Sequence, residues 1–181
     1  MRIFIGIKIE DCLERIIEVQ DNLRRRDYYA NYTRSGNIHL TLAFLGEKGN
    51  EEIKKLGETL DQINYNTFDI TINKLTNLRD MVVLEVEKTA PLLELQNILR
   101  KKLFLAGFSL DKRKYYPHIT LSRKTNLQIE EDLLMKECVQ EIILFSSERR
   151  ENVLTYRPLH IKKLYKNNQE EENKGEENES I

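Results

Sequence analysis

The sequence predicts an α+β protein with two pseudo-symmetric lobes of antiparallel-rich sheet, helices packed outside, and a cleft between the lobes. Segments with the period of strands alternate along the chain with segments that have the period of helices. A strand–helix–strand succession occurs twice, and 36 positions separate both Phe4 from Leu40 and Val83 from Ile119. Each succession ends on one pattern, HLTL over residues 39–42 and HITL over residues 118–121, although the chain has only three histidines.

The first unit begins with a strand over residues 2–9, which are dense in β-branched side chains. Apolar residues then recur at near-helical spacing over 13–23, with Asp11 as the expected N-cap. A polar loop leads to the first motif strand at 38–44. A second amphipathic helix is predicted over 51–63, and clean alternation predicts a strand over 68–72.

The second unit repeats this order with a strand over residues 81–86 and a helix over 91–105. Pro91 suits the first turn of that helix, and Gly107 suits its C-terminal stop. A loop then leads to the second motif strand at 118–122. A closing hairpin is expected from strands over 139–145 and 153–164 around a turn at 148–152.

Charge divides the chain into two parts. The whole chain has a formal net charge of −1, but residues 167–181 contain six Glu and one Lys, which leaves residues 1–166 at +4. We therefore expect one internally duplicated domain over 1–166 and a disordered acidic tail over 167–181. The mildly basic domain favours an anionic substrate.

Composition also limits the cellular setting. No apolar stretch reaches the length that a membrane span needs, and the N-terminus lacks the pattern of a signal peptide. Cys12 and Cys138 lie far apart with no CxxC spacing, as expected of reduced thiols. The sequence predicts a cytoplasmic protein without membrane association, and we expect a monomer.

The repeated pattern suits acid–base chemistry on a phosphate ester. In a strand, residues i and i+2 share a face, so each His lies beside the Thr of its motif while the flanking apolar residues point into the core. Two such strands side by side would place two imidazoles and two hydroxyls in one cleft. The histidines show no HxxxH or HExxH spacing, so we expect no metal and no cofactor.

The motifs resemble those of the 2H phosphoesterase superfamily, and its LigT-like RNA 2′,3′-cyclic phosphodiesterase branch in particular. The likeness lies in RIFIGI at 2–7, NIHLTLAFLG at 37–46, PHITLSR at 117–123 and LFSS at 144–147, and it spans about residues 1–165. The resemblance implies a metal-independent hydrolysis of a 2′,3′-cyclic phosphate that leaves a 2′-phosphate end.

The resemblance also implies roles for the motif residues. His39 is assigned as the acid that protonates the leaving 3′ oxygen, and His118 as the base that activates water. Thr41 and Thr120 would donate hydrogen bonds to the non-bridging oxygens, where charge gathers in the transition state. Substrate binding is assigned to three residues near the motifs, namely Arg123, Phe44 and Tyr116.

Both loops that lead into the motif strands are basic and rich in tyrosine, namely residues 24–34 and 112–116. Positive charge follows a phosphate backbone and aromatic rings stack on bases, although solvated loops with packed tyrosines have the same composition. The expected partner is RNA with a 2′,3′-cyclic phosphate end, tRNA fragments included. Two alternatives stay open: a superfamily relative acting on a small cyclic nucleotide or a 2′–5′ linkage, and a non-catalytic RNA- or nucleotide-binding module.

Overall fold

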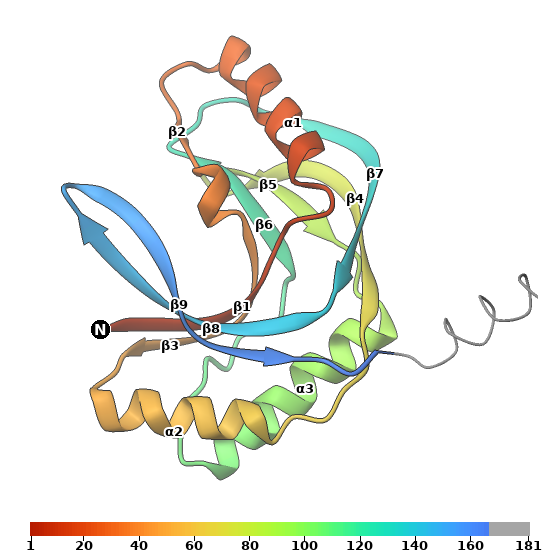
Figure 1. Cartoon of the computed structure of the whole chain (residues 1–181). Coiled ribbons are helices and arrows are strands. Elements are labelled where there is room, and N and C mark those ends of the chain that lie inside the picture. The colour runs from red at the N-terminus through yellow and green to blue at the C-terminus, as the bar shows by residue number, and fades with distance from the viewer. Residues whose placement is uncertain (167–181) are drawn as a thin grey trace, which may run out of the picture.

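Two antiparallel sheets form the protein in a computed structural model that describes residues 1–166 (Figure 1). The expected acidic tail lies outside the described residues. The four-stranded sheet has the order β3-β1-β8-β9, with β1 (Arg2–Lys8), β3 (His39–Glu47), β8 (Glu141–Arg150) and β9 (Val153–Lys163). The five-stranded sheet has the order β2-β6-β5-β4-β7, with β2 (Asn31–Tyr32), β4 (Phe68–Leu78), β5 (Met81–Val86), β6 (His118–Arg123) and β7 (Glu130–Val139). With three α-helices, this arrangement confirms the predicted α+β class.

The two sheets are built alike, because a motif strand lies beside the opening strand of its own unit in each. β3 pairs with β1, and β6 pairs with β5, both antiparallel. The third strand differs in origin, since β8 comes from the end of the chain and β4 from its middle. The pseudo-symmetry expected from the repeat is therefore present in the order of the strands.

The helix of each unit packs against the sheet that contains the motif strand of the other unit. Helix α1 (Leu13–Arg26) follows β1, but Gln20 on α1 donates a hydrogen bond to the Leu121 carbonyl on β6 at 3.0 Å. Helix α3 (Ala90–Leu105) follows β5 but packs against β3, beside α2 (Asn50–Asp61), which contacts β9. Figure 1 shows α1 on the lobe of β4 to β7, with α2 and α3 on the other lobe. The lobes therefore exchange elements and are not consecutive halves of the chain.

One large apolar core extends through both lobes. It takes the inward side chains of β1, such as Ile3, Ile5 and Ile7, together with buried residues of every α-helix. Leu40 and Ile119, the apolar residues that follow the motif histidines, are completely buried in it. This burial fixes the opposite face of each motif strand toward the cleft.

The closing hairpin differs from its prediction. β8 and β9 pair continuously to Arg150 and Val153, and the turn is only Glu151 and Asn152, both with positive φ. The polar residues that suggested a turn at 148–152 in fact extend the hairpin beyond the end of β1 as a two-stranded ribbon. Val139 belongs to β7, a strand that was not expected.

The start of α1 also differs from its prediction. Asp11 does not cap α1: the N-cap residue is Cys12, and no side chain caps the helix from that position. Asp11 instead accepts a hydrogen bond from the Cys138 backbone N–H on β7 at 2.9 Å.

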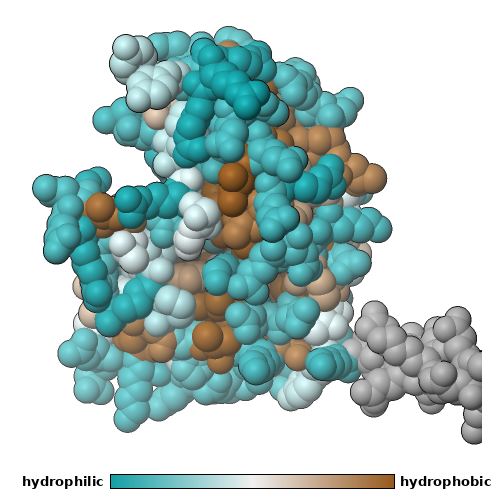
Figure 2. Space-filling model, turned by 45° about the horizontal axis from the view of Figure 1, so that its top comes forward, coloured by the Kyte–Doolittle hydropathy of each residue, from teal (hydrophilic) through white to brown (hydrophobic). Residues whose placement is uncertain are grey.

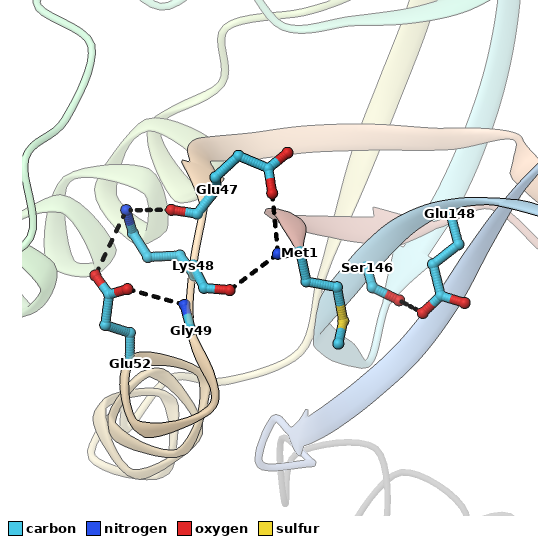
Figure 3. Close-up of polar contacts among 7 residues, drawn as sticks. All are labelled: Met1, Glu47, Lys48, Gly49, Glu52, Ser146 and Glu148. Atoms are coloured by element: carbon cyan, nitrogen blue, oxygen red, sulfur yellow. Dashed lines mark hydrogen bonds and ion pairs between the residues drawn. The ribbon is translucent and has the colours of Figure 1, made fainter.

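The N-terminus is fixed at the junction between β3 and α2 (Figure 3). The Met1 ammonium lies 2.9 Å from the Glu47 carboxylate and donates to the Lys48 carbonyl at 3.0 Å. Glu52 in turn accepts a hydrogen bond from the Gly49 N–H at the start of α2. These contacts hold the outer end of β1, whose inner end carries the residues opposite the first motif. Within residues 1–166, no helix is both long and apolar enough to cross a membrane.

Candidate active site

The first motif histidine lies at the start of β3 with its ring held on both nitrogens. Its Nδ1 is 2.7 Å from the Asn37 carbonyl oxygen, and its Nε2 is 3.0 Å from the Thr41 hydroxyl. A carbonyl oxygen can only accept, so Nδ1 of His39 carries a proton. The neutral ring therefore has its free electron pair on Nε2, beside Thr41, and Nε2 is the nitrogen that can take up or release a proton.

The second motif histidine repeats this geometry on β6. His118 Nδ1 lies 2.7 Å from the Tyr116 carbonyl oxygen, again two residues before the histidine. The same reasoning places a proton on Nδ1 and leaves Nε2 of His118 as the exchangeable site. Both histidines are thus fixed by the backbone in one tautomer.

A β-bulge after each motif threonine brings one more residue to the cleft face. On β3, Thr41 is opposite Gly6 and Ala43 is opposite Ile5, so Leu42 is the extra residue. On β6, Leu121 is the extra residue at the same place in the motif. Because a bulge reverses the alternation of faces, the residue three positions after each threonine returns to the face of the His and Thr.

The residues brought back are the predicted substrate-binding pair. Phe44 lies opposite Phe4 on β1, and Arg123 lies opposite Met81 on β5. Both are exposed, with Phe44 at 56% of its surface. In an unbulged strand both would have pointed into the core, so the bulges explain why both side chains lie on the cleft face, while substrate binding by them stays a prediction.

Aromatic rings surround His39. The Phe4 ring centre lies 4.8 Å from the His39 ring centre, and the Tyr156 ring meets His39 edge-on at 5.0 Å. Phe4 also stacks on Phe145 at 5.1 Å. This small second core covers the cleft side of the four-stranded sheet and keeps water from one side of the imidazole.

The enclosure changes the acidity of His39. Burial lowers the pKa of His39 below its usual value of 6.5, because the charged ring loses its hydration. The hydrogen bond to the Asn37 carbonyl opposes this shift, and the positive charges of His118 and Arg123 add to it. The two motif histidines and Arg123 therefore act on one another in the same cleft.

A glycine makes room for the first motif. Gly6 lies opposite Thr41, and a Cβ at this position would be 2.8 Å from the Leu40 carbonyl oxygen and 3.5 Å from the His39 ring. Only a residue without a side chain lets β1 approach the motif strand this closely.

His118 has a different neighbour in Tyr116. Their ring centres are 5.3 Å apart with an angle of 27° between the planes, and the Tyr116 hydroxyl donates to Glu85 at 2.7 Å. Glu85 lies opposite His118 on β5. Tyr116, predicted to bind substrate, thus lies in the cleft as a neighbour of the second motif histidine.

The two motif strands meet across the cleft. The Tyr115 hydroxyl, from the loop before β6, donates to the Thr41 carbonyl on β3 at 3.0 Å. Burial raises the pKa of Tyr156, and the positive charges of Arg123 and Arg2 oppose that rise. Arg123 belongs to the five-stranded sheet and Tyr156 to the four-stranded sheet, so groups from both lobes lie around one space. Figure 2 shows the surface hollowed between the β8–β9 hairpin and the lobe that carries α1.

The basic, tyrosine-rich loop before β3 divides into two kinds of residue. Tyr28 and Tyr29 are exposed by 79% and 91% and contact each other edge to face. Tyr32 is half-buried and donates to the Asp27 carbonyl, with Arg24 over its ring. In this loop, the predicted stacking on bases therefore suits only Tyr28 and Tyr29.

Asn37 is the residue that sequence reasoning missed. It is buried, its carbonyl fixes His39, and its side-chain amide donates to the Leu154 carbonyl at 2.9 Å while its amide oxygen accepts from the Tyr156 N–H at 3.2 Å. Asn37 lies two residues before His39, as Tyr116 lies two residues before His118, and this shared spacing was the available signal. A contact made by the main chain does not depend on the residue type, so the sequence did not reveal it.

The third histidine lies outside the cleft. His160 on β9 is hydrogen-bonded to Asp61 at 2.8 Å, and its ring packs over Gly57 of α2. Residues 1–166 contain no group of three or more His, Cys, Asp or Glu side chains arranged to hold a metal ion.

Comparison with known proteins gives relatives of one kind. The sequence profile of the 2′-5′ RNA ligase superfamily matches residues 13–147. The RNA 2′,3′-cyclic phosphodiesterase of Thermotoga maritima is 32% identical over 131 residues, which cover 68% of this chain and 70% of the relative. The protein of the same name from Bacillus subtilis is 36% identical over 128 residues, covering 67% and 70%.

Solved structures agree with the sequence relatives. The crystal structure of Escherichia coli LigT in apo form has a TM-score of 0.74 at 25% identity and covers 91% of this chain and 97% of LigT. LigT complexed with 3′-AMP has the same TM-score at 28% identity, covering 90% and 97%. The fold predicted from the resemblance is thus confirmed, and this chain belongs to the 2′-5′ RNA ligase superfamily, the 2H phosphoesterases that its paired motifs indicated.

Proposed function

We propose that this chain is an RNA 2′,3′-cyclic phosphodiesterase that hydrolyses 2′,3′-cyclic phosphate ends to 2′-phosphate ends. The observation that carries the proposal is the matched geometry of His39 and His118, each with Nδ1 bound to a backbone carbonyl and Nε2 left to exchange a proton. The curated relatives named RNA 2′,3′-cyclic phosphodiesterase support the substrate class.

The two histidines divide the proton transfers. In-line attack on the cyclic phosphate needs a base for the incoming water and an acid for the departing oxygen on opposite sides of phosphorus. His118 accepts the proton of water, and His39, as imidazolium, protonates the leaving 3′ oxygen through Nε2. The anionic substrate favours the imidazolium of His39, which counteracts the lowered pKa of that ring in the free protein.

The other motif residues bind the phosphate and its nucleoside. Thr41 and Thr120 donate their hydroxyl hydrogens to the non-bridging oxygens. Thr41 also contacts His39 Nε2, so it holds the ring until substrate replaces this contact. Arg123 pairs with the phosphate through its planar guanidinium, while Phe44 and Tyr116 contact the nucleoside.

We further propose the physiological setting. Residues 1–166 would act as one catalytic domain, monomeric and cytoplasmic, on RNA ends such as those of tRNA fragments. The two histidines supply the acid and the base, so the reaction needs no metal.

Hydrolysis of a short RNA with a 2′,3′-cyclic phosphate end, in excess EDTA, tests the proposal. His118→Ala and His39→Ala should each lower kcat by about 10²–10⁴-fold. His160→Ala is the matched control, because His160 lies on β9 outside the cleft, hydrogen-bonded to Asp61, and its loss should leave kcat within twofold. Absence of turnover by the wild type, with RNA still bound, would instead indicate a non-catalytic binding module.

A further inference from the structure

A groove of about 430 Å³ lies next to the catalytic cleft and takes no part in the proton transfers. Residues 34–37, mainly the 3₁₀ helix η1 (Ser35–Asn37), form one side, and residues 154–156 of β9 form the other. Asn37 and Tyr156 belong to both the groove and the surroundings of His39, so the two spaces adjoin.

The groove is preformed. The Asn37 side chain connects its two walls, since it donates to the Leu154 carbonyl and accepts from the Tyr156 N–H. Because Asn37 is buried and bonded at both ends of its amide, a ligand entering the groove does not have to order these walls.

Arg34 supplies an unneutralised positive charge at the rim. It is exposed, and its guanidinium has no hydrogen bond or ion pair with the other residues that the structure describes. Three other arginines are engaged, since Arg24 pairs with Asp21, Arg26 with Glu131, and Arg157 with Glu148. A free guanidinium at the rim of a preformed groove suits a phosphodiester.

We infer that this groove binds single-stranded RNA at the nucleotide preceding the terminal cyclic phosphate, with Arg34 on the connecting phosphodiester. This inference rests on the proposed function. The groove adjoins the surroundings of His39 through Asn37 and Tyr156, so a strand whose end reaches the histidines would extend toward it. The exposed pair Tyr28 and Tyr29 precedes β2, which separates it from Arg34, and offers rings to bases further along the strand.

The test compares two substrates that differ only in length, a nucleoside 2′,3′-cyclic monophosphate and a trinucleotide with a 2′,3′-cyclic phosphate end. Arg34→Ala should raise the ratio of the trinucleotide KM to the mononucleotide KM about tenfold, the effect of losing one charge-assisted contact. It should also reduce the slope of log KM against log salt for the trinucleotide by about 0.7, as expected for one phosphate of a single strand.

Lys54→Ala is the matched control, because Lys54 is an exposed cation on α2 and lies outside the groove. It should leave the KM ratio and the salt slope at the wild-type values, and Arg34→Lys should fall between wild type and Arg34→Ala. An unaltered ratio and slope in Arg34→Ala would overturn the inference, as would equal KM increases for both substrates. Failure of the wild type to hydrolyse either substrate would contradict the proposed function itself, which keeps the two failures distinct.

Discussion

Backbone carbonyls, rather than acidic side chains, orient the two motif imidazoles. Asn37 and Tyr116 each present a main-chain oxygen to the Nδ1 of the histidine two residues later. A neutral partner fixes the tautomer without adding negative charge, so it stabilises the imidazolium less than a carboxylate would. On the proposed mechanism, the protonation of His39 therefore depends on the substrate phosphate more than on the protein.

A titration can test this dependence. In the free protein, we expect the NMR resonances of the His39 ring to titrate with a pKa below 6.5, because burial disfavours its charged form. A saturating nucleoside 2′-monophosphate should raise that pKa, since its negative charge favours the imidazolium. A free-state pKa above 6.5 would contradict the effect of burial, and no rise on binding would contradict the assignment of His39 as the acid.

Gly6 allows a second test at this scale. Gly6→Ala should lower the free energy of unfolding by about 1–3 kcal/mol, because its Cβ would press on the Leu40 carbonyl, which is backbone and cannot turn away. Urea unfolding followed by circular dichroism measures the change. Gly36→Ala is the control, since nothing lies within 4 Å of a Cβ there, and it should not lower stability. Equal stabilities of the two variants would exclude the steric explanation.

Sequence reasoning found the motif residues because their chemistry is carried by side-chain type and period. His39, Thr41, His118 and Thr120 share a cleft, as an i, i+2 pattern predicts. The two bulges were not predicted. Leu42 and Leu121 are apolar and buried, and the sequence does not show that they have no residue opposite them on the neighbouring strand. Gly6 and Asn37 were missed since their roles depend on the approach of other backbone segments.

At the scale of elements, Glu137 ties an unexpected strand to the start of α1. This buried carboxylate on β7 accepts hydrogen bonds from three successive backbone N–H groups, at 2.8, 3.1 and 3.1 Å, belonging to Glu10, Asp11 and Cys12. Burial, with the nearby Glu137 carboxylate, raises the pKa of the Cys12 thiol to about 12. Cys12 is thus an inert packing residue, as its isolated position in the sequence suggested.

Removal of this carboxylate should loosen α1. Glu137→Ala leaves three peptide N–H groups without their acceptor, and we expect a loss of about 2 kcal/mol or more in the free energy of unfolding. Glu131→Ala on the same strand is the control, because Glu131 forms only an exposed ion pair with Arg26 and its loss should cost less than about 0.5 kcal/mol. Chemical denaturation of both variants measures this loss. A similar loss in the free energy of unfolding for Glu137→Ala and Glu131→Ala would show that Glu137 does not stabilise the start of α1.

β7 itself could not be recognised from its composition. Its first four residues, Glu130 to Leu133, include three acids, and the strand joins the five-stranded sheet only at the edge beside β4. Edge strands tolerate such charge, so their polar sequences are similar to those of loops. The helices, by contrast, were placed within a few residues, because each buries an apolar stripe against a sheet.

At the scale of the whole molecule, the exchange of helices makes the two lobes depend on each other. α1 is covalently part of the β1–β3 unit but packs on β6 and β7, and α3 packs on β3 while belonging to the β5–β6 unit. The repeat in the sequence predicted two similar lobes but not this exchange, because the sequence does not indicate which sheet a helix covers.

The exchange predicts cooperative unfolding. Denaturant-dependent hydrogen exchange should give β8, in the four-stranded sheet, and β5, in the five-stranded sheet, the same free energy of opening, since neither lobe can lose its helix without exposing the shared core. The exposed hairpin tip around Glu151 should open at lower cost and serves as the comparison. Two separate transitions for β8 and β5 would show that the lobes are independent.

The unequal pair Phe44 and Arg123 has a consequence for how a molecule can lie in the cleft. Two identical halves would accept a phosphodiester in either of two opposite orientations with equal free energy, and half of the bound molecules would present the wrong oxygen to each histidine. For the phosphodiester that we propose as substrate, an aromatic ring at one end and a guanidinium at the other would remove this degeneracy, and each 1.4 kcal/mol of difference gives a tenfold preference for one orientation. The two repeated units alone would allow both orientations, and the difference between Phe44 and Arg123 would favour one of them.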